Sequence, residues 1–212
     1  MIKHICFDLD GTLVDSKETI LKSTKAALDS LSIRYDIPED IFNNMIGMHF
    51  VDIFKELKIE VNDFEKFLSI YKSLYFDFMK YSQLYPGVEE ALSHLQKKGI
   101  LISLLTTKMQ EQADKIINHF KLQASFNFIM GRRNGMKHKP SPEPLLYICS
   151  ELLVKPDETL IVGDTELDMQ CGKNAGTKTC GVLFGYRTSD QIENEKPDYI
   201  ISGLDELRKV ID

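Results

Sequence analysis

Near the N-terminus the chain reads Ile5-Cys6-Phe7-Asp8-Leu9-Asp10-Gly11-Thr12-Leu13. The apolar, β-prone beginning predicts a buried strand, and the Gly-Thr pair predicts a sharp turn directly after it. Two aspartates at alternate positions are costly at the end of a buried strand unless a positive charge lies beside them, and a divalent cation is the simplest candidate. A solvated Asp-rich turn is the alternative, although functional sites of α/β proteins gather at the carboxyl ends of strands.

The composition is that of an ordinary globular protein. The 212 residues, 43% of them hydrophobic and 27% charged, suffice for one sizeable core with or without a small accessory domain. The net charge of −6 argues against non-specific binding to nucleic acid, and no apolar run reaches membrane-spanning length. Charged residues follow too early for an N-terminal secretion signal, and the four dispersed cysteines favour neither disulfides nor zinc. We therefore expect a cytoplasmic protein.

The segment 16–81 is predicted to be helical throughout. Its apolar residues follow helical spacing, and no strand signal interrupts it. The longest amphipathic stripe of the chain lies here and consists of Phe64, Phe67, Leu68, Tyr71, Leu74, Tyr75 and Phe78. Such a stripe is more typical of a helix-bundle core than of a cofactor site. We expect this segment to form a small helical domain of its own.

After Tyr85-Pro86-Gly87 the pattern changes to helices that alternate with apolar strands. The expected strands lie at 100–105, 126–130, 159–162, 179–184 and 199–201. This alternation predicts an α/β core with a parallel sheet covered by helices on both faces. The expected division of the chain is a catalytic core of residues 1–15 and 82–212, with the helical domain of residues 16–81 inserted into it.

In such a sheet the ligand site lies beyond the carboxyl ends of the strands. This rule brings together four segments, which carry Asp8 with Asp10, Thr106 with Thr107, Lys139, and Asp164 with Asp168. Each side-chain type has a role if the substrate is a phosphate. Carboxylates supply the oxygen ligands that Mg²⁺ prefers, and threonine and lysine can bind phosphate oxygens. An ionised Asp8 could attack phosphorus while Asp10 gives a proton to the leaving oxygen.

Four motifs in this chain resemble those of the haloacid dehalogenase superfamily, in the subfamily with a helical cap inserted after the first motif. The resemblance spans nearly the whole sequence. The motifs are Asp8-Leu9-Asp10-Gly11-Thr12, Thr106 after an apolar strand, Lys139 in Lys139-Pro140-Ser141-Pro142, and Gly163-Asp164-Thr165-Glu166-Leu167-Asp168. The resemblance implies a Rossmann-like parallel-sheet core that carries an all-helical cap domain.

The resemblance also implies a role for each motif residue. Asp8 is expected to be the nucleophile that forms an aspartyl-phosphate, and Asp10 the general acid/base. Asp8, the backbone carbonyl of Asp10 and Asp164 are expected to hold Mg²⁺. Asp168 is expected to support the metal site and Lys139. The residues expected to bind the phosphoryl group are Lys139, Thr106 and Thr107. His49 in the cap loop is expected to contact the substrate. His49 is equally consistent with a leaving-group contact and with an ordinary exposed loop histidine.

The choice of reaction follows from individual residues within the resemblance. Asp10 is absent from the dehalogenases and phosphonate hydrolases of this superfamily, and Ile20 stands where its sugar-phosphate mutases carry a proton-shuttling histidine. A Mg²⁺-dependent phosphatase of small organic phosphates is therefore expected, with a small phosphorylated metabolite as its partner and a monomer or homodimer as its assembly. The segments 181–187 and 197–201 resemble phosphoglycolate phosphatases, whereas Thr106-Thr107-Lys108 resembles the related pyrophosphatases.

An inorganic pyrophosphatase is accordingly the first alternative. A phosphomutase is a weaker alternative because of Ile20. A non-catalytic phosphate-binding protein is weaker as well, because Asp8, Asp10, Lys139 and Asp164 are all present.

Overall fold

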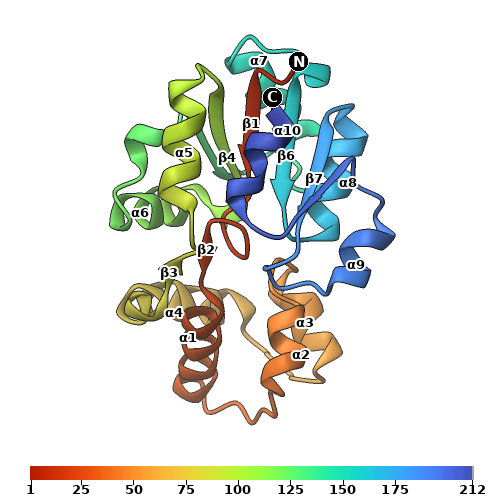
Figure 1. Ribbon diagram of the computed structural model, residues 1–212. Coiled ribbons are helices and arrows are strands. Elements are labelled where there is room, and N and C mark those ends of the chain that lie inside the picture. The colour runs from red at the N-terminus through yellow and green to blue at the C-terminus, as the bar shows by residue number, and fades with distance from the viewer. Residues whose placement is uncertain (212) are drawn as a thin grey trace. The chain divides into compact units, whose positions relative to one another are not determined.

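The strand β1 (His4–Phe7) is buried along its whole length and lies in the interior of a six-stranded parallel sheet. Figure 1 shows this arrangement in the computed structural model, which describes residues 1–211. The strand order is β5-β4-β1-β6-β7-β8. The other strands of this sheet are β4 (Leu101–Met109), β5 (Phe128–Arg132), β6 (Thr159–Gly163), β7 (Lys178–Val182) and β8 (Tyr199–Ile201).

The register of the central strands aligns their carboxyl ends. Phe7 of β1 lies opposite Leu104 of β4 and Val162 of β6. The backbone N–H of Asp8 then donates to the carbonyl oxygen of Val162 at 2.9 Å, which continues the ladder by one residue. The residues that follow β1 and β6 therefore emerge at the same edge of the sheet.

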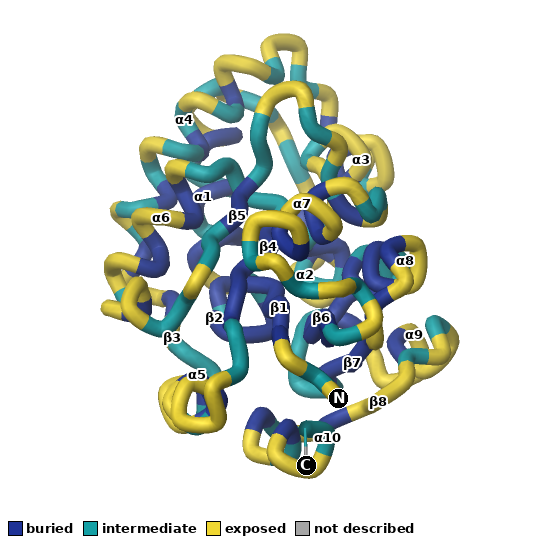
Figure 2. The backbone as a smooth tube through the Cα atoms, turned by 90° about the horizontal axis from the view of Figure 1, so that it is seen from above, coloured by how far each residue is buried: buried dark blue, intermediate teal, exposed yellow. Residues whose placement is uncertain are grey.

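Helices cover both faces of the sheet, as the alternating sequence pattern predicts. Figure 2 shows α5 and α10 on one face and α7 and α8 on the other. The helix α6 packs against β4 and β5, and α9 packs against β7. The bounds of these helices are α5 (Val88–Lys97), α6 (Gln110–His119), α7 (Glu143–Glu151), α8 (Glu166–Ala175), α9 (Ser189–Asn194) and α10 (Leu207–Ile211). Short 3₁₀ turns lie at η2 (Gln123–Ser125), η3 (Pro156–Glu158) and η4 (Leu204–Glu206).

The sheet interior contains a polar group at its centre. His4 is fully buried, and its two ring nitrogens lie 3.1 Å from the Thr159 hydroxyl and 2.8 Å from the Ser103 hydroxyl. Burial lowers the pKa of His4 to about 4, so this side chain is neutral at physiological pH. Both nitrogens have partners in the neutral ring, which explains how a histidine is tolerated in a central strand.

The contacts divide the chain into two compact units, Met1–Leu13 with Leu84–Asp212, and Val14–Gln83. The expected insert, residues 16–81, lies two residues inside each boundary of the second unit, and its status as an independent domain stays a prediction. On the core side of these boundaries, the backbone N–H of Tyr85 donates to the carbonyl of Leu13 at 3.0 Å. Two short strands, β2 (Val14–Asp15) and β3 (Gln83–Leu84), form a separate two-stranded sheet.

The second unit is built from helices around an aromatic cluster. Rings of Phe50, Phe54, Phe67 and Tyr71 lie with centroid separations of 4.7 to 6.1 Å, mostly edge to face. Phe67 is fully buried, so the aromatic stripe forms a core, as its helical spacing predicts. The elements of this unit are α1 (Lys17–Ser30), α2 (Glu39–Asn44), α3 (Phe50–Glu56), α4 (Phe64–Asp77) and η1 (Met79–Tyr81).

The expected fold class, a Rossmann-like parallel sheet with an all-helical insert, is confirmed. The largest difference concerns β4, which was expected to end at Leu105 and continues to Met109. The pairing of β4 with β5 shifts between these two residues, so Thr106, Thr107 and Lys108 lie in an irregular, bulged part of the strand. The helix α9 and the strands β2 and β3 were not expected. Among residues 1–211 no helix is both long and apolar enough to cross a bilayer.

Candidate active site

Three buried carboxylates meet at the carboxyl edge of the sheet. Asp8 follows β1, Asp164 follows β6, and Asp168 lies in the first turn of α8. One oxygen atom from each of them lies within 4.8 Å of the other two. Asp164 and Asp168 are fully buried, and Asp8 is nearly so. Two of the four segments that were expected to converge, those of Asp8 and of Asp164 with Asp168, thus meet in the structure.

Lys139 supplies positive charge to this cluster. Its Nζ lies 2.8 Å from Asp8 Oδ1 and 2.6 Å from Asp168 Oδ1, and its side chain is 2% exposed. Burial by itself lowers the pKa of this ammonium, but Asp168 and Asp8 outweigh burial and raise it. The lysine therefore remains charged beside the buried carboxylates of Asp8 and Asp168.

Asp168 is occupied by protein donors on both of its oxygens. Oδ1 accepts a hydrogen bond from Lys139 Nζ. Oδ2 accepts hydrogen bonds from the Thr165 backbone N–H at 3.1 Å and from the Thr165 hydroxyl at 2.6 Å. Thr165 and Asp168 form the capping box at the N-terminus of α8. The pattern Thr165-x-x-Asp168 is visible in the sequence and could have revealed this support. The arrangement suits Asp168 to the positioning of Lys139 more than to direct coordination.

Asp164 is held in place by a backbone N–H group and a hydroxyl group. Its Oδ2 accepts from the Tyr186 backbone N–H at 2.8 Å, and its Oδ1 accepts from the Thr12 hydroxyl at 3.2 Å. A Cβ atom at Gly11 or Gly185 would overlap the Asp164 carboxylate, and Gly11 has a φ of +84°. Both positions therefore need glycine for this close approach. The sequence predicted a turn at Gly11-Thr12, but it did not predict that these residues, Tyr186 or Gly185 contact Asp164.

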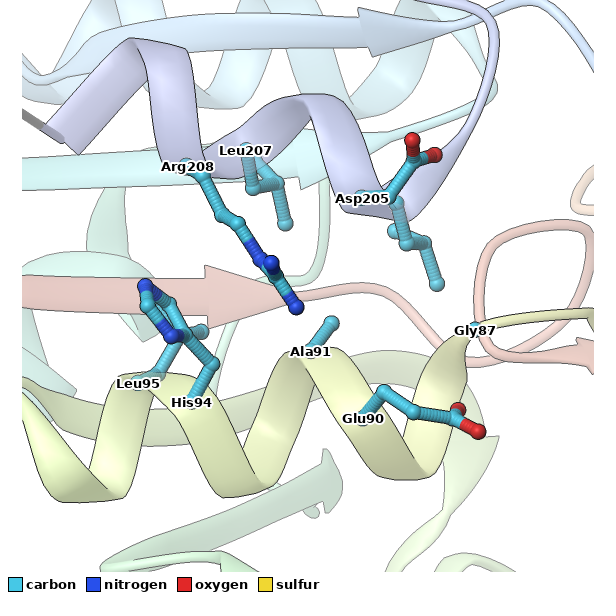
Figure 3. A pocket seen from close by; sticks show the side chains of 9 residues that line it. Gly87, Glu90, Ala91, His94, Leu95, Asp205, Leu207 and Arg208 are labelled. Atoms are coloured by element: carbon cyan, nitrogen blue, oxygen red, sulfur yellow. The ribbon is translucent and has the colours of Figure 1, made fainter.

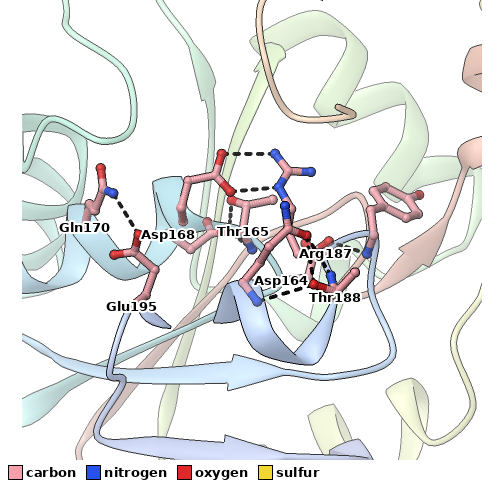
Figure 4. Close-up of polar contacts among 10 residues, drawn as sticks. Asp164, Thr165, Asp168, Gln170, Arg187, Thr188 and Glu195 are labelled. Carbon is pink, nitrogen blue, oxygen red and sulfur yellow. Dashed lines mark hydrogen bonds and ion pairs between the residues drawn. The ribbon is translucent and has the colours of Figure 1, made fainter. Parts of the chain in front are cut away.

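An ion pair fixes the segment that carries Tyr186. Arg187 donates to the two carboxylate oxygens of Glu166 at 2.7 and 3.0 Å, as Figure 4 shows, and Arg187 is 5% exposed. A two-pronged contact of this kind is geometrically specific, because both nitrogens of the guanidinium must face the carboxylate. The contact joins the loop after β7 to the first turn of α8. It was not expected, since no local sequence signal connects these two positions.

Asp10 lies outside the buried cluster and has a cation beside it. Asp10 Oδ2 lies 3.2 Å from Lys108 Nζ, and the two side chains are 11% and 10% exposed. Lys108 comes from the bulged end of β4, and its backbone N–H donates to the Thr106 hydroxyl at 3.2 Å. Thr106 is buried, whereas Thr107 is half-buried. Sequence reasoning recognised Lys108 only as part of a resemblance and gave it no role in the site.

The donor set fits a hard divalent cation. Asp8 and Asp164 offer carboxylate oxygens close together, which are the ligands that Mg²⁺ prefers alongside water and phosphate oxygens. Burial, followed by the charge of Asp168, raises the pKa of Asp164 to about 7, and burial likewise raises the pKa of Asp8 against the opposing effect of Lys139. Ionising these two neighbouring buried carboxyl groups is therefore costly, and a bound cation would offset that cost.

His49 belongs to the helical unit, whereas the other expected site residues belong to the core unit. It is exposed and directly precedes α3 in the helical unit. Its expected contact with a leaving group stays a prediction.

A separate surface hollow of about 200 Å³ lies between α5 and the C-terminal segment (Figure 3). Ala91, Leu95, Leu204 and Leu207 line it together with charged residues such as Arg208. None of the expected site residues is among its lining residues, so the hollow is distinct from the carboxylate cluster.

Comparison with known proteins places this geometry in a family. The family model described as haloacid dehalogenase-like hydrolase matches residues 5–182. A phosphoglycolate phosphatase of Aquifex aeolicus is 32% identical over 212 residues, with 100% of this chain and 97% of that protein covered. A pyrophosphatase PpaX of Bacillus mycoides is 32% identical over 213 residues, with 99% and 97% covered.

Solved structures of this family have the same fold as this chain. A crystal structure from Haemophilus somnus, described as a predicted phosphoglycolate phosphatase, is 27% identical, has a TM-score of 0.86, and covers 100% of this chain and 98% of its own. A haloacid dehalogenase-like protein of Streptococcus pneumoniae has a TM-score of 0.90 at 23% identity, covering 100% and 99%, and this likeness concerns the fold alone. The chain therefore belongs to the haloacid dehalogenase-like hydrolase family and is one of its phosphatases.

Proposed function

We propose that this phosphatase hydrolyses small organic phosphate monoesters with Mg²⁺ and forms an aspartyl-phosphate on Asp8. The observation that carries the proposal is the pairing of Asp8 with Asp164 and Lys139 at one edge of the sheet, with Asp10 two residues further on. A carboxylate nucleophile needs its charge and that of the phosphate balanced, and this cluster supplies the groups for both.

The chain's own residues divide the work of the first step. Asp8 attacks phosphorus with an ionised oxygen, and Lys139 reduces the repulsion between this oxygen and the phosphoryl group. The Thr106 hydroxyl accepts from the Lys108 backbone, so its own hydrogen can donate to a phosphate oxygen. Asp8 and Asp164, with the backbone carbonyl of Asp10, would hold Mg²⁺, which offsets the charge on the transferring phosphoryl group when it is bound.

Asp10 acts on protons in both half-reactions. In the first, its carboxyl group gives a proton to the leaving oxygen, so that this oxygen departs as a hydroxyl group rather than as an alkoxide. In the second, its carboxylate takes a proton from the water that attacks the aspartyl-phosphate on Asp8, which restores both aspartates. Among the alternatives, a mutase receives no support from the helical unit, because Ile20 is a buried apolar residue of α1 that cannot carry a proton.

We infer phosphoglycolate, or a closely similar short anionic ester, as the preferred substrate. The likeness of the segments 181–187 and 197–201 to phosphoglycolate phosphatases supports it, and so does the Aquifex aeolicus relative. Pyrophosphate is the second candidate, supported by Thr106-Thr107-Lys108 and by the equally similar pyrophosphatase of Bacillus mycoides.

A screen of phosphoglycolate, pyrophosphate, sugar phosphates and nucleotides with Mg²⁺ tests this assignment. We expect kcat/KM for phosphoglycolate to exceed that for sugar phosphates and nucleotides by at least about tenfold, because a site that binds a charged group discriminates against substrates that lack it. If pyrophosphate dominates instead, the second candidate is correct. Similar rates on all compounds would contradict both.

Binding of Mg²⁺ should release protons and weaken as the pH falls below about 7. The reason is that the pKa of Asp164 is raised to about 7, so below this pH its carboxylate is increasingly protonated, while a metal ligand must be ionised. We expect an apparent affinity that drops by up to about tenfold per pH unit below this value.

Isothermal titration of the protein with Mg²⁺ between about pH 6 and about pH 8 measures this effect. Titrations in two buffers with different enthalpies of ionisation count the protons released. Asp164→Asn serves as the control, because it removes the titrating ligand and should abolish both binding and the proton release. An affinity that stays constant across this range would contradict the prediction.

A further inference from the structure

Lys108 occupies an unusual place for a lysine. It lies where the pairing of β4 with β5 shifts, and a bulge at the end of a strand turns side chains away from the regular alternation. Its side chain is only 10% exposed, and a lysine is rarely buried to this extent unless it has a partner. The partner is Asp10, 3.2 Å away, which itself comes from the turn after β1. The bulge thus directs an ammonium to the proton-carrying residue of the proposed reaction.

The position of Lys108 is tied to the phosphate-binding residue as well. Its backbone N–H donates to the hydroxyl of the buried Thr106 at 3.2 Å. The lysine is therefore tied to Thr106 through its backbone and to Asp10 through its side chain. An ammonium held in this way keeps a defined place relative to the phosphoryl group.

This geometry limits how far a leaving group can be from Lys108. Asp10 must come within hydrogen-bonding distance of the leaving oxygen in order to protonate it. If the Asp10 oxygen that lies 3.2 Å from Lys108 Nζ also makes this contact, the leaving oxygen is within about 6 Å of the ammonium. An anionic group attached one or two bonds beyond that oxygen can reach the ammonium directly.

The two lysines of the site lie beside different aspartates. Lys139 is paired with Asp8 and Asp168, on the side of the nucleophile. Lys108 is paired with Asp10, on the side of the leaving group. The charge of Lys139 is therefore matched to the phosphoryl group that every substrate carries, whereas Lys108 can respond to a charge that only some leaving groups carry.

We propose that Lys108 is a specificity residue that selects substrates whose leaving group bears its own negative charge. The proposal rests on the proposed phosphatase function and defines its substrate class further. The carboxylate of phosphoglycolate and the second phosphate of pyrophosphate share this chemistry, since each places an anion close to the scissile bond. The ammonium binds this anion while it remains beside Asp10, so that one cation faces both groups.

A different role for Lys108 would be to hold Asp10 in position and nothing more. In that case its loss would slow the hydrolysis of every substrate by a similar factor. A pair of substrates that differ only in the charge of the leaving group separates the two roles. Phosphoglycolate and hydroxyethyl phosphate are such a pair, because a carboxylate in the first is replaced by a neutral hydroxymethyl group in the second.

The experiment compares the wild type with Lys108→Met on both substrates. We expect kcat/KM for phosphoglycolate to fall by about 30-fold or more, and that for hydroxyethyl phosphate to change by less than about threefold, because only the first substrate loses a charge partner. Pyrophosphate is the second substrate with an anionic leaving group. Its kcat/KM should fall together with that of phosphoglycolate if its second phosphate binds the same lysine. Lys108→Arg, which retains the charge, should keep the preference for the anionic substrate.

Lys3→Met is the matched control. Lys3 is an exposed lysine that pairs with Glu158 next to the opposite end of β1, so its loss removes the same charge away from the site. It should leave both substrates unaffected. If Lys108→Met does not fold, Lys108→Gln gives the same comparison with a polar side chain of similar length.

Equal losses on both substrates, or an unchanged preference in folded Lys108→Met, would overturn the proposal. A failure of the proposed function would look different. In that case the wild type itself would hydrolyse none of these phosphates.

Discussion

Asp8→Asn should remove nearly all turnover, by a factor of at least about 10⁴ in kcat, because asparagine cannot act as the carboxylate nucleophile. We expect the free energy of unfolding to stay the same or to increase. Burial raises the pKa of Asp8, and the carboxylates of Asp168 and Asp164 add to that effect, so a neutral side chain relieves repulsion there. Lys139 keeps its second partner, Asp168, at 2.6 Å.

The measurement combines steady-state kinetics with detection of a phosphoryl adduct on Asp8 by mass spectrometry after rapid acid quenching. Asp10→Asn is the informative control. It retains the nucleophile and should still form the adduct from p-nitrophenyl phosphate, whose leaving group departs without a proton, but should hydrolyse the adduct slowly. Near-normal turnover in Asp8→Asn would rule out the covalent mechanism.

Lys139→Met should lose both turnover and stability. The substitution leaves Asp8 and Asp168 without the ammonium that lies 2.8 and 2.6 Å from them, in a site where the lysine side chain is 2% exposed. Removing one partner of a buried ion pair costs about 3–5 kcal/mol, because the remaining charge stays buried without compensation. A loss of this size is a large part of the stability of an ordinary domain.

The loss of stability in Lys139→Met should depend on pH in a defined direction. Without the lysine, the carboxylates have a higher pKa in the folded than in the unfolded state, so the folded state binds more protons. Stability then falls as the pH rises through this range and recovers as the pH falls. The variant should therefore be closest to the wild type at about pH 5 and furthest from it at about pH 8.

Urea unfolding of both proteins at these two pH values, in the absence of Mg²⁺, measures the difference. Lys178→Met provides the control, because Lys178 is an exposed lysine that pairs with Asp198. We expect little change in that variant at either pH. A destabilisation of Lys139→Met that does not vary with pH would contradict the electrostatic explanation and favour a simple loss of packing.

Much of the site could be predicted because its residues follow strands of one parallel sheet. Asp8 and Asp164 are far apart in sequence, yet each comes directly after an apolar strand, and the register of β1 with β6 brings them to the same edge. The convergence of Lys139 with these residues was a weaker inference, because Lys139 lies in a loop rather than at a strand end. Its short distances to Asp8 and Asp168 show that it belongs to the cluster.

The contacts that sequence reasoning missed have a common physical origin. The pair Lys108–Asp10 depends on a shift in strand pairing, and a bulge leaves no clear mark in the alternation of apolar residues. The pair Arg187–Glu166 joins the loop after β7 to the first turn of α8, and these segments meet only because β6 and β7 are neighbours in the sheet. Both contacts are set by tertiary structure, whereas the capping box of Thr165 and Asp168 is local and can be read from the chain.

The hydrogen bond between Tyr85 and Leu13 has a consequence for how such enzymes diversify. This hydrogen bond brings the chain back to the core beside the point at which it left, so residues 14–84 form an insertion with neighbouring ends. Insertions of this kind can be lengthened, shortened or exchanged at a small entropic cost to the host domain. Recombination could therefore replace the whole helical segment in one event while the carboxylates and lysines of the core keep their geometry, which would allow new substrates to be acquired without reinventing the chemistry.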